Sequence, residues 1–220
     1  MNNIGTLPGD RLAGLSADLF HKLQAGSITL DEFAVFLQRK DRDPFKFERN
    51  EHDDHVVLTV TGLDLTGEQE VEQLNAAGFR VSDWVKSCLT SKKADGYDKN
   101  HRLVAGQVYK IALMPTREIK CDSDRTTDAL RERGIKKYGY EKPLAGIVPR
   151  IREVVSDKQM EEMGFRYVVA PHDAIKDPDG SPSVLRVSRS GSGPWLHAHL
   201  DHLDRQWDDG GAFAFLVPAS

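Results

Sequence analysis

The sequence contains only two cysteines, Cys88 and Cys121, which lie far apart in the chain. Two cysteines cannot build a disulfide framework or a zinc ribbon, and such scarcity is typical of a reducing cytosol. The chain also lacks any apolar run close to the ~20 residues that span a bilayer. Residues 1–5 show neither the basic nor the apolar region of a secretory signal. These absences lead us to expect a cytoplasmic protein that has no membrane partner.

Motifs of nucleophilic catalysis and of nucleotide binding are missing as well. The sequence has no Gly-x-Ser-x-Gly elbow and no phosphate-binding Gly-x-x-x-x-Gly-Lys-Ser/Thr loop, and neither cysteine has a local partner motif. What the chain does contain is close to a globular average, with 39% hydrophobic and 29% charged residues, so collagen, coiled-coil and fully disordered classes are excluded. Function must therefore be sought in surfaces and clusters.

The first 43 residues are expected to fold as a helical hairpin. Leucines recur at helical spacing before Gly26, and Thr29 with Glu32 forms a capping box for a second helix. A DNA-reading helix-turn-helix has the same outline, but Asp31 and Glu32 at the start of the second helix would repel phosphates. The segment 1–43 is therefore interpreted as a packing hairpin, which could serve as a protein-interaction module.

From residue 44 onward, strand and helix patterns are interspersed. β-Branched and apolar runs predict strands over 55–61 and 107–114. Cap residues and helical spacing predict helices over 66–77, 82–89, 124–138, 143–155 and from Ser156 to Gly164. Pro149 lies inside one of these spans, so a kink or a break is expected there. This part forms a central mixed α/β segment followed by further helices.

The last quarter of the chain has a different texture. Short strand candidates at 165–170, 183–188, 195–199 and 212–217 are separated by stretches rich in Gly, Pro, Asp and Ser. This pattern predicts a small antiparallel β meander or half-barrel. The fold class is α+β, divided into 1–43, 44–122 and 123–220, where the last two segments could also form one continuous domain.

Charge is distributed unevenly along the chain. The net charge is −7 over residues 1–85, +7 over residues 86–158 and −4 over residues 159–220. A basic middle is typical of a surface that meets a polyanion such as nucleic acid, although the three segments could also neutralise one another within the fold. Lysine and arginine would contact phosphates, and a tyrosine could stack on an unpaired base. The candidate contact residues are Lys92, Lys93, Tyr97, Lys99, Arg102, Arg133, Lys136 and Lys137.

Three stretches of the sequence resemble one family. They are PFKFERNEHDDHVVLTVTGLDLTG, DGYDKNHRLVAGQVYKIALMP and the run from GFRYVVAPHD to the last residue, and together they cover most of residues 44–220. They resemble uncharacterised proteins of uncultivated candidate-phylum bacteria. The resemblance implies a bacterial, cytosolic protein. Because that family has no assigned activity, no functional residue is carried over from it.

One string matches a metal-binding motif. His197, His199, Asp201 and His202 spell the His-x-His-x-Asp-His of metallo-β-lactamase-fold hydrolases, in which imidazoles and a carboxylate hold two zinc ions. That fold needs further ligands downstream, and no histidine follows His202. A strand over 195–199 would place His197 and His199 on one face, with Trp195 beside them. The same geometry describes the solvent face of an amphipathic strand.

Three functions remain open on these grounds. The leading hypothesis is a non-catalytic cytosolic binding or accessory protein that has no cofactor and contacts nucleic acid or another polyanion through the basic central segment. The second is a metal-dependent hydrolase, with a divalent metal at the His197 cluster. The third is a protein-interaction module built on the acidic hairpin. The polar cluster Glu51–His55 is interpreted as a solvated loop.

Overall fold

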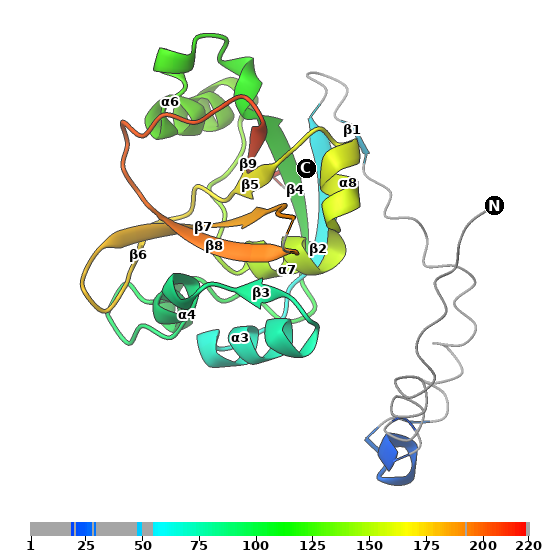
Figure 1. Cartoon of the computed structure of the whole chain (residues 1–220). Helices are drawn as coiled ribbons and strands as arrows, with labels where there is room; N and C mark the ends of the chain where they lie inside the picture. Colours follow the sequence, from blue (N-terminus) through cyan, green and yellow to red (C-terminus); the bar gives the residue numbers. More distant parts are fainter. Residues whose placement is uncertain are drawn as a thin grey trace, which may run out of the picture. The chain divides into compact units, whose positions relative to one another are not determined.

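The computed structural model describes residues 19, 21–27, 29, 48, 49, 55–191 and 193–218. Contacts within the chain divide it into two compact units, Met1–Pro44 and Phe45–Ser220. The predicted hairpin over 1–43 falls almost entirely outside the described residues, among which Leu19 and residues 21–24 are helical. The second unit combines helices with one mixed sheet, which confirms the α+β class (Figure 1).

The described strands form a nine-stranded sheet in the order β1-β2-β4-β9-β5-β7-β8-β3, with β6 paired to β7. The strands predicted from β-branched and apolar runs are confirmed, with small shifts at their ends. The bounds of the nine described strands, including the unpredicted β1, β3 and β6, are β1 Glu48–Arg49, β2 Val56–Thr61, β3 Arg80–Val81, β4 Val108–Pro115, β5 Tyr167–Val169, β6 Ile175–Lys176, β7 Pro182–Ser188, β8 Trp195–Leu200 and β9 Gly211–Leu216.

The C-terminal strands do not form the separate meander or half-barrel expected from their spacing. β5, β7 and β8 do pair antiparallel as neighbours, but β9 lies between β4 and β5, antiparallel to the first and parallel to the second. Segments 44–122 and 123–220 therefore build one sheet. The reason is burial on both faces: Ala212 and Ala214 of β9 pack on one side, and Phe213 and Phe215 pack on the other. Such a strand is typical of a sheet centre.

Six α-helices of the described second unit are joined by shorter helical turns. Capping boxes at Thr66 with Gln69 and at Ser156 with Gln159 are confirmed, and Gly164 ends the last helix with φ +80°. None of the helices in the described ranges is both long and apolar enough to cross a membrane. The bounds are α3 Gly67–Ala76, α4 Asp83–Leu89, α5 Tyr97–Asn100, α6 Thr127–Glu132, α7 Ile147–Val154, α8 Asp157–Glu162, the 3₁₀ turns η1 Thr116–Glu118 and η2 Asp122–Asp124, and the π-helical turn η3 Arg133–Lys137.

Two helical expectations need correction. The helix predicted over 143–155 begins at Ile147, so Pro149 lies in its first turn, where a proline has no helical hydrogen bond to lose. The expected kink is therefore replaced by a later helix start. The helix predicted over 124–138 consists of α6 followed directly by η3. There Gly134 lies against the ring of Phe215, where an added Cβ would come within 2.3 Å of the ring.

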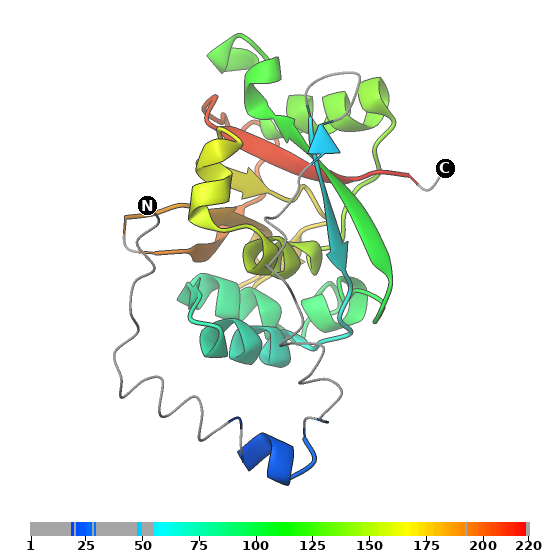
Figure 2. The same ribbon diagram turned by 90° about the vertical axis from the view of Figure 1, so that its right-hand side faces the viewer.

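The two faces of the sheet carry different layers. One face holds the larger core, in which Val56, Leu58 and Val60 of β2 pack with residues of α3, α4, α7 and α8. On the other face, Phe213 packs with Leu130 of α6 and with Trp207 of the loop before β9. In Figure 2 the red β9 ribbon separates α6 from α3, α4, α7 and α8. This second core, around Phe213, covers the middle of that face of the sheet and leaves the face half-exposed where β7 and β8 lie.

A buried ionic network joins α3, α5 and α7 in the larger core. Glu70 accepts a hydrogen bond from the Tyr97 hydroxyl at 3.0 Å and forms an ion pair with Arg150. Arg150 also lies 2.9 Å from Glu153. Burial raises the pKa of Glu70 to about 7, against the opposing influence of Arg150 and of the Tyr97 hydrogen bond. The protonated carboxyl is thus favoured in the folded protein more than in the unfolded chain.

Replacing Glu70 by glutamine should flatten the dependence of stability on pH. Because the folded pKa of about 7 exceeds the ordinary value of 4.5 for a glutamate, Glu70 contributes stability that is complete below pH 4.5 and lost as pH rises through 7. The unfolding free energy of Glu70→Gln relative to the parent should therefore rise by about 2–3 kcal/mol from pH 5 to pH 8. Urea unfolding at each pH measures this. Glu72→Gln, exposed on the same helix, is the control, and equal pH slopes for both variants would contradict the assignment.

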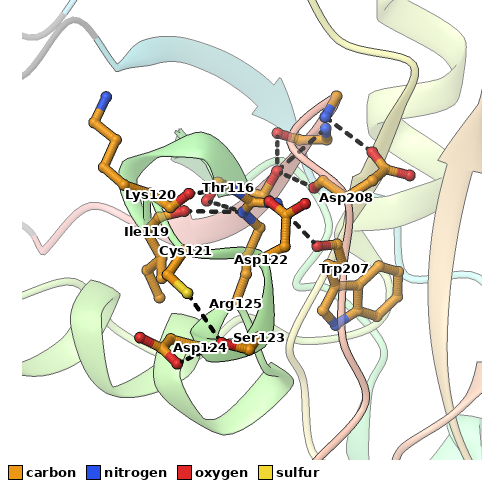
Figure 3. A network of polar contacts seen from close by, with 12 residues as sticks. Thr116, Ile119, Lys120, Cys121, Asp122, Ser123, Asp124, Arg125, Trp207 and Asp208 are labelled. Atoms are coloured by element: carbon orange, nitrogen blue, oxygen red, sulfur yellow. Dashed lines mark hydrogen bonds and ion pairs between the residues drawn. The ribbon is translucent and has the colours of Figure 1, made fainter.

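Arg125 connects the segment after β4 to the loop before β9. It is 3% exposed, and its guanidinium donates hydrogen bonds to four backbone carbonyls as well as to the Asp122 carboxylate, as Figure 3 shows. The carbonyls are those of Thr116 at 3.1 Å, Ile119 at 3.0 Å, Lys120 at 3.4 Å and Trp207 at 3.3 Å. The Trp207 amide returns a hydrogen bond to the Arg125 carbonyl at 2.9 Å. Arg125 therefore fixes the position of the loop that carries Trp207.

Candidate functional site

Two of the four basic residues predicted in the 91–102 stretch are paired with carboxylates. Lys92 is 3.2 Å from Glu68 and 3.4 Å from Asp98, and Arg102 is 2.7 Å from Asp64. Lys99 is exposed on α5, whereas Lys93 lines a cleft. Neutralisation within the fold, the alternative left open by the sequence, therefore applies to Lys92 and Arg102.

Tyr97 cannot stack on a base from its position in the fold. Its side chain is fully buried beneath α5, and its hydroxyl donates to Glu70. The stretch that looked like a polar loop contains this short helix, and the helix turns its one aromatic ring into the core. The sequence does not indicate the partner of the hydroxyl, because the carboxylate that satisfies it lies 27 positions away.

The second basic group, on η3, is also occupied by local contacts. Arg133 binds Glu118 at 2.6 Å, Lys136 binds Glu132 at 2.5 Å, and the Lys137 ammonium donates to the Tyr138 hydroxyl at 2.5 Å. These contacts compete with any phosphate for the same charges.

Glu118 is the centre of a cluster that the sequence did not indicate. Burial by itself would raise its pKa, but hydrogen bonds from His55, Tyr138 and Arg133 outweigh burial and lower the pKa to about 2. His55 was expected in a solvated loop and is instead fully buried, between Glu118 and the Tyr140 hydroxyl at 2.8 Å. The cluster stabilises the junction of β2, η1 and η3.

The four predicted metal ligands are not brought together. Within the described residues, no group of three His, Cys, Asp or Glu side chains is placed to hold a metal ion. Asp201 instead forms an ion pair with Arg131 at 2.8 Å, and His202 is exposed in the following turn. The ring of His197 stacks on Trp195 at 5.0 Å, and the ring of His199 meets Trp207 edge-on at 5.8 Å. The sequence matches the metal-binding motif, but the structure does not form a metal site, because the Asp201 carboxylate is paired with Arg131.

The expected alternation along β8 is confirmed. Leu196 and Ala198 are buried in the larger core, while Trp195, His197 and His199 are half-buried on the other face. This is the face that the second core leaves half-exposed at its β7–β8 end. The strand thus presents one indole and two imidazole rings in a row.

Three arginines lie over aromatic rings beside this row. Arg186 stands opposite His197 on β7, with its guanidinium carbon 5.5 Å from the centre of the Tyr167 ring. Arg80 lies 5.4 Å from the ring centre of Trp195, and Arg205 lies 4.9 Å from that of Trp207. Cation–π contacts of this kind orient a guanidinium without neutralising its charge. We call Arg80, Arg186, Arg205, Trp195, His197 and His199 the β8 platform.

None of the three arginines of the β8 platform forms an ion pair with a described carboxylate, although Asp208 lies close enough to oppose the lowering of the Arg186 pKa by burial. Asp201 and Asp208, which lie in the adjoining loop, form ion pairs with Arg131 and Arg166 at 2.8 Å each. The Nε atoms of Arg186 and Arg205 and the Nε2 atom of His199 are buried without a hydrogen-bond partner. The Nε atoms of five other arginines in the described residues are also buried without a partner, so this property is not particular to the platform.

The arginines of the β8 platform affect the imidazoles beside them. Burial, together with the nearby Arg186 and Arg205, lowers the pKa of His199 to about 3. Burial and Arg186 likewise lower the pKa of His197. Both imidazoles are therefore neutral at physiological pH, so they offer ring faces and hydrogen bonds while the arginines carry the positive charge.

Comparison with protein-family models, curated proteins and solved structures found no match to this chain. The site is therefore judged on its own geometry. Sequence analysis found Trp195, His197 and His199 but gave the histidines a metal role, and it missed all three arginines. Arg80, Arg186 and Arg205 are far apart in the sequence, and only the strand pairing β3-β8-β7 and the loop held by Arg125 bring them together.

Proposed function

We propose that this chain is a non-catalytic, cytosolic binding protein that holds single-stranded nucleic acid on the β8 platform. The observation that carries the proposal is the set of three guanidinium groups that lie over aromatic rings and form no ion pair with a described carboxylate. Phosphates would supply the missing negative charge, and unstacked bases would lie on the half-exposed rings. The site is thus moved from the predicted basic central segment to β7, β8 and the loop before β9.

The shape of the surface favours a single strand over a duplex. The platform follows an extended strand, and the stacked pair of Trp195 and His197 lies half-exposed on it. A stacking surface requires bases whose faces are accessible, which a paired duplex does not offer. Base–aromatic stacking contributes roughly 1–3 kcal/mol per base and tolerates any sequence. The expected ligand is therefore a short single strand bound without strong sequence preference.

The proposal is tested by fluorescence anisotropy with labelled single strands of about 10 nucleotides, as DNA and as RNA, and with a matching duplex. The double variant Arg186→Gln/Arg205→Gln should bind the single strand at least tenfold more weakly. It should also reduce the slope of log affinity against log salt by about 1.4, since each phosphate contact to a single strand contributes about 0.7. Trp195→Ala should weaken binding fivefold or more and leave that slope unchanged.

The matched control removes two positive charges elsewhere. Lys136→Gln/Lys158→Gln changes two exposed lysines that pair with glutamates on their own helices. If this control weakens binding as much as the arginine variant does, the attraction is due to net charge and the platform is refuted. Tighter binding of the duplex than of the single strand, or no binding at low salt, would also refute it.

A further inference from the structure

A cleft of about 790 Å³ lies away from the β8 platform, and none of the platform residues lines it. Its walls come from the loop before α5, the end of α5, the segment before α7 and the region of β6. Five ionisable side chains line it, together with Asn100 and small apolar side chains. The five are Lys93, Asp95, His101, Asp173 and Lys176.

His101 presents a fixed hydrogen-bond donor to this cleft. The residue is only 3% exposed, and its Nδ1 accepts a hydrogen bond from the Ala145 amide at 3.4 Å. Burial lowers the pKa of His101, so the ring is neutral and its proton is on Nε2. Among the described residues Nε2 has no hydrogen-bond partner, although the side chain lines the cleft. The His101 side chain therefore lines this space and has one ring nitrogen with no hydrogen-bond partner among the described residues.

A second histidine holds His101 in place. The His172 ring meets His101 edge-on at 5.1 Å, and burial lowers the pKa of His172 to about 3. Its Nε2 accepts from the Leu185 amide at 3.0 Å and its Nδ1 donates to the Asp173 carbonyl at 2.6 Å. Both nitrogens of His172 are thus used by the protein, so only His101 has a nitrogen left for a ligand.

Lys93 adds a positive charge to the cleft that acts on Asp95 only at a distance, without a close ion pair. The two acids in the walls are already neutralised, Asp95 by Lys176 at 3.0 Å and Asp173 by Lys142 at 2.6 Å. Lys93 forms no ion pair with a described carboxylate. The cleft therefore offers the Lys93 ammonium and the neutral His101 imidazole. The other lining groups are paired charges and apolar side chains such as Pro143 and Leu144.

We infer that this cleft binds the oxyanion group of a small organic molecule, a carboxylate or a phosphate, between the Lys93 ammonium and the His101 Nε2–H. An oxyanion accepts both kinds of donor, and a charge-assisted hydrogen bond from lysine is about twice as strong as one between neutral groups. The apolar side chains would contact the carbon skeleton of the molecule. This site is separate from the β8 platform, so either can fail without the other.

NMR titration of the whole chain with sodium acetate and with inorganic phosphate, at constant ionic strength, tests the inference. Each probe should cause saturable shifts of the His101 and Asn100 amides, with dissociation constants in the millimolar range expected for so few contacts. Whichever probe binds more tightly identifies the source of the oxyanion. The imidazole spectrum of the protein alone should show the proton on Nε2 of His101.

Lys93→Gln should weaken this binding at least fivefold. Lys99→Gln, which removes an exposed charge from the neighbouring α5 outside the cleft, should leave it unchanged. His101→Gln should weaken it as well, with circular dichroism to confirm that the variant is folded. Linear, non-saturating shifts, equal effects of the two lysine variants, or a proton on Nδ1 of His101 would each overturn the inference.

Discussion

Arg125→Met should reduce the unfolding free energy by at least ~3 kcal/mol. The guanidinium serves four backbone carbonyls, and its loss leaves buried acceptors unpaired at about 1–3 kcal/mol each. The Asp122 carboxylate is 90% exposed and will be hydrated, so it adds little. Methionine fills much of the volume and makes no hydrogen bond, so the measured loss reports the polar contacts.

Urea unfolding monitored by circular dichroism and tryptophan fluorescence measures this loss. Lys120→Met removes an exposed positive charge from the same segment and should change stability by less than about 0.5 kcal/mol. Because Arg125 binds the Trp207 carbonyl, the near-ultraviolet signal of Trp207 should change in Arg125→Met and not in the control. A loss below 1 kcal/mol would contradict the role given to Arg125.

Gly67→Ala should destabilise the protein by about 3 kcal/mol, although alanine normally stabilises a helix by about 1 kcal/mol over glycine. Gly67 is the first residue of α3, and a Cβ at this position would lie 1.8 Å from the carbonyl oxygen of Leu89. Leu89 is the buried last residue of α4, so the two helices would have to separate. Any shift of Gly67 away from Leu89 would also disturb the hydrogen bond from the Gly67 amide to Asp98 of α5 at 2.7 Å.

Thermal unfolding of Gly67→Ala beside Gly191→Ala checks this expectation. Gly191 is exposed and has nothing within 4 Å of the added Cβ, so its replacement should be nearly neutral. The direction of the stability change in Gly67→Ala is decisive. A stabilised variant would mean that α3 and α4 do not touch at Gly67.

The elements of the fold could be predicted because their signals are local. Thr66 with Gln69 caps α3, Gly164 ends α8, and the alternation of Leu196 and Ala198 with the rings of β8 sets the buried face. The order of the strands could not be predicted in this way. Nothing near β9 in the sequence specifies that it lies between β4 and β5, since that choice depends on packing against both cores.

The candidate sites show the same division between local and distant contacts. Lys93 was among the predicted anion-binding residues and does line a cleft, whereas Tyr97, four residues later, is buried through its contact with Glu70. His101 lies in the same stretch, but its role depends on Ala145 and His172. The residue types of this stretch indicate polar groups that could bind a ligand. Only the tertiary contacts decide which of these groups stay accessible to a ligand.

The position of β9 also determines when the sheet can be completed during synthesis. While residues 211–216 are still inside the ribosome, β4 and β5 each have an edge with no strand to pair with. The emerged chain then holds two half-sheets, β1-β2-β4 and β5-β7-β8, that share no ladder of hydrogen bonds. Exposed edges of this kind invite pairing with other chains, and contacts distant in sequence form slowly. The nascent protein is therefore most prone to aggregation just before β9 emerges, when a chaperone that shields strand edges would help it most.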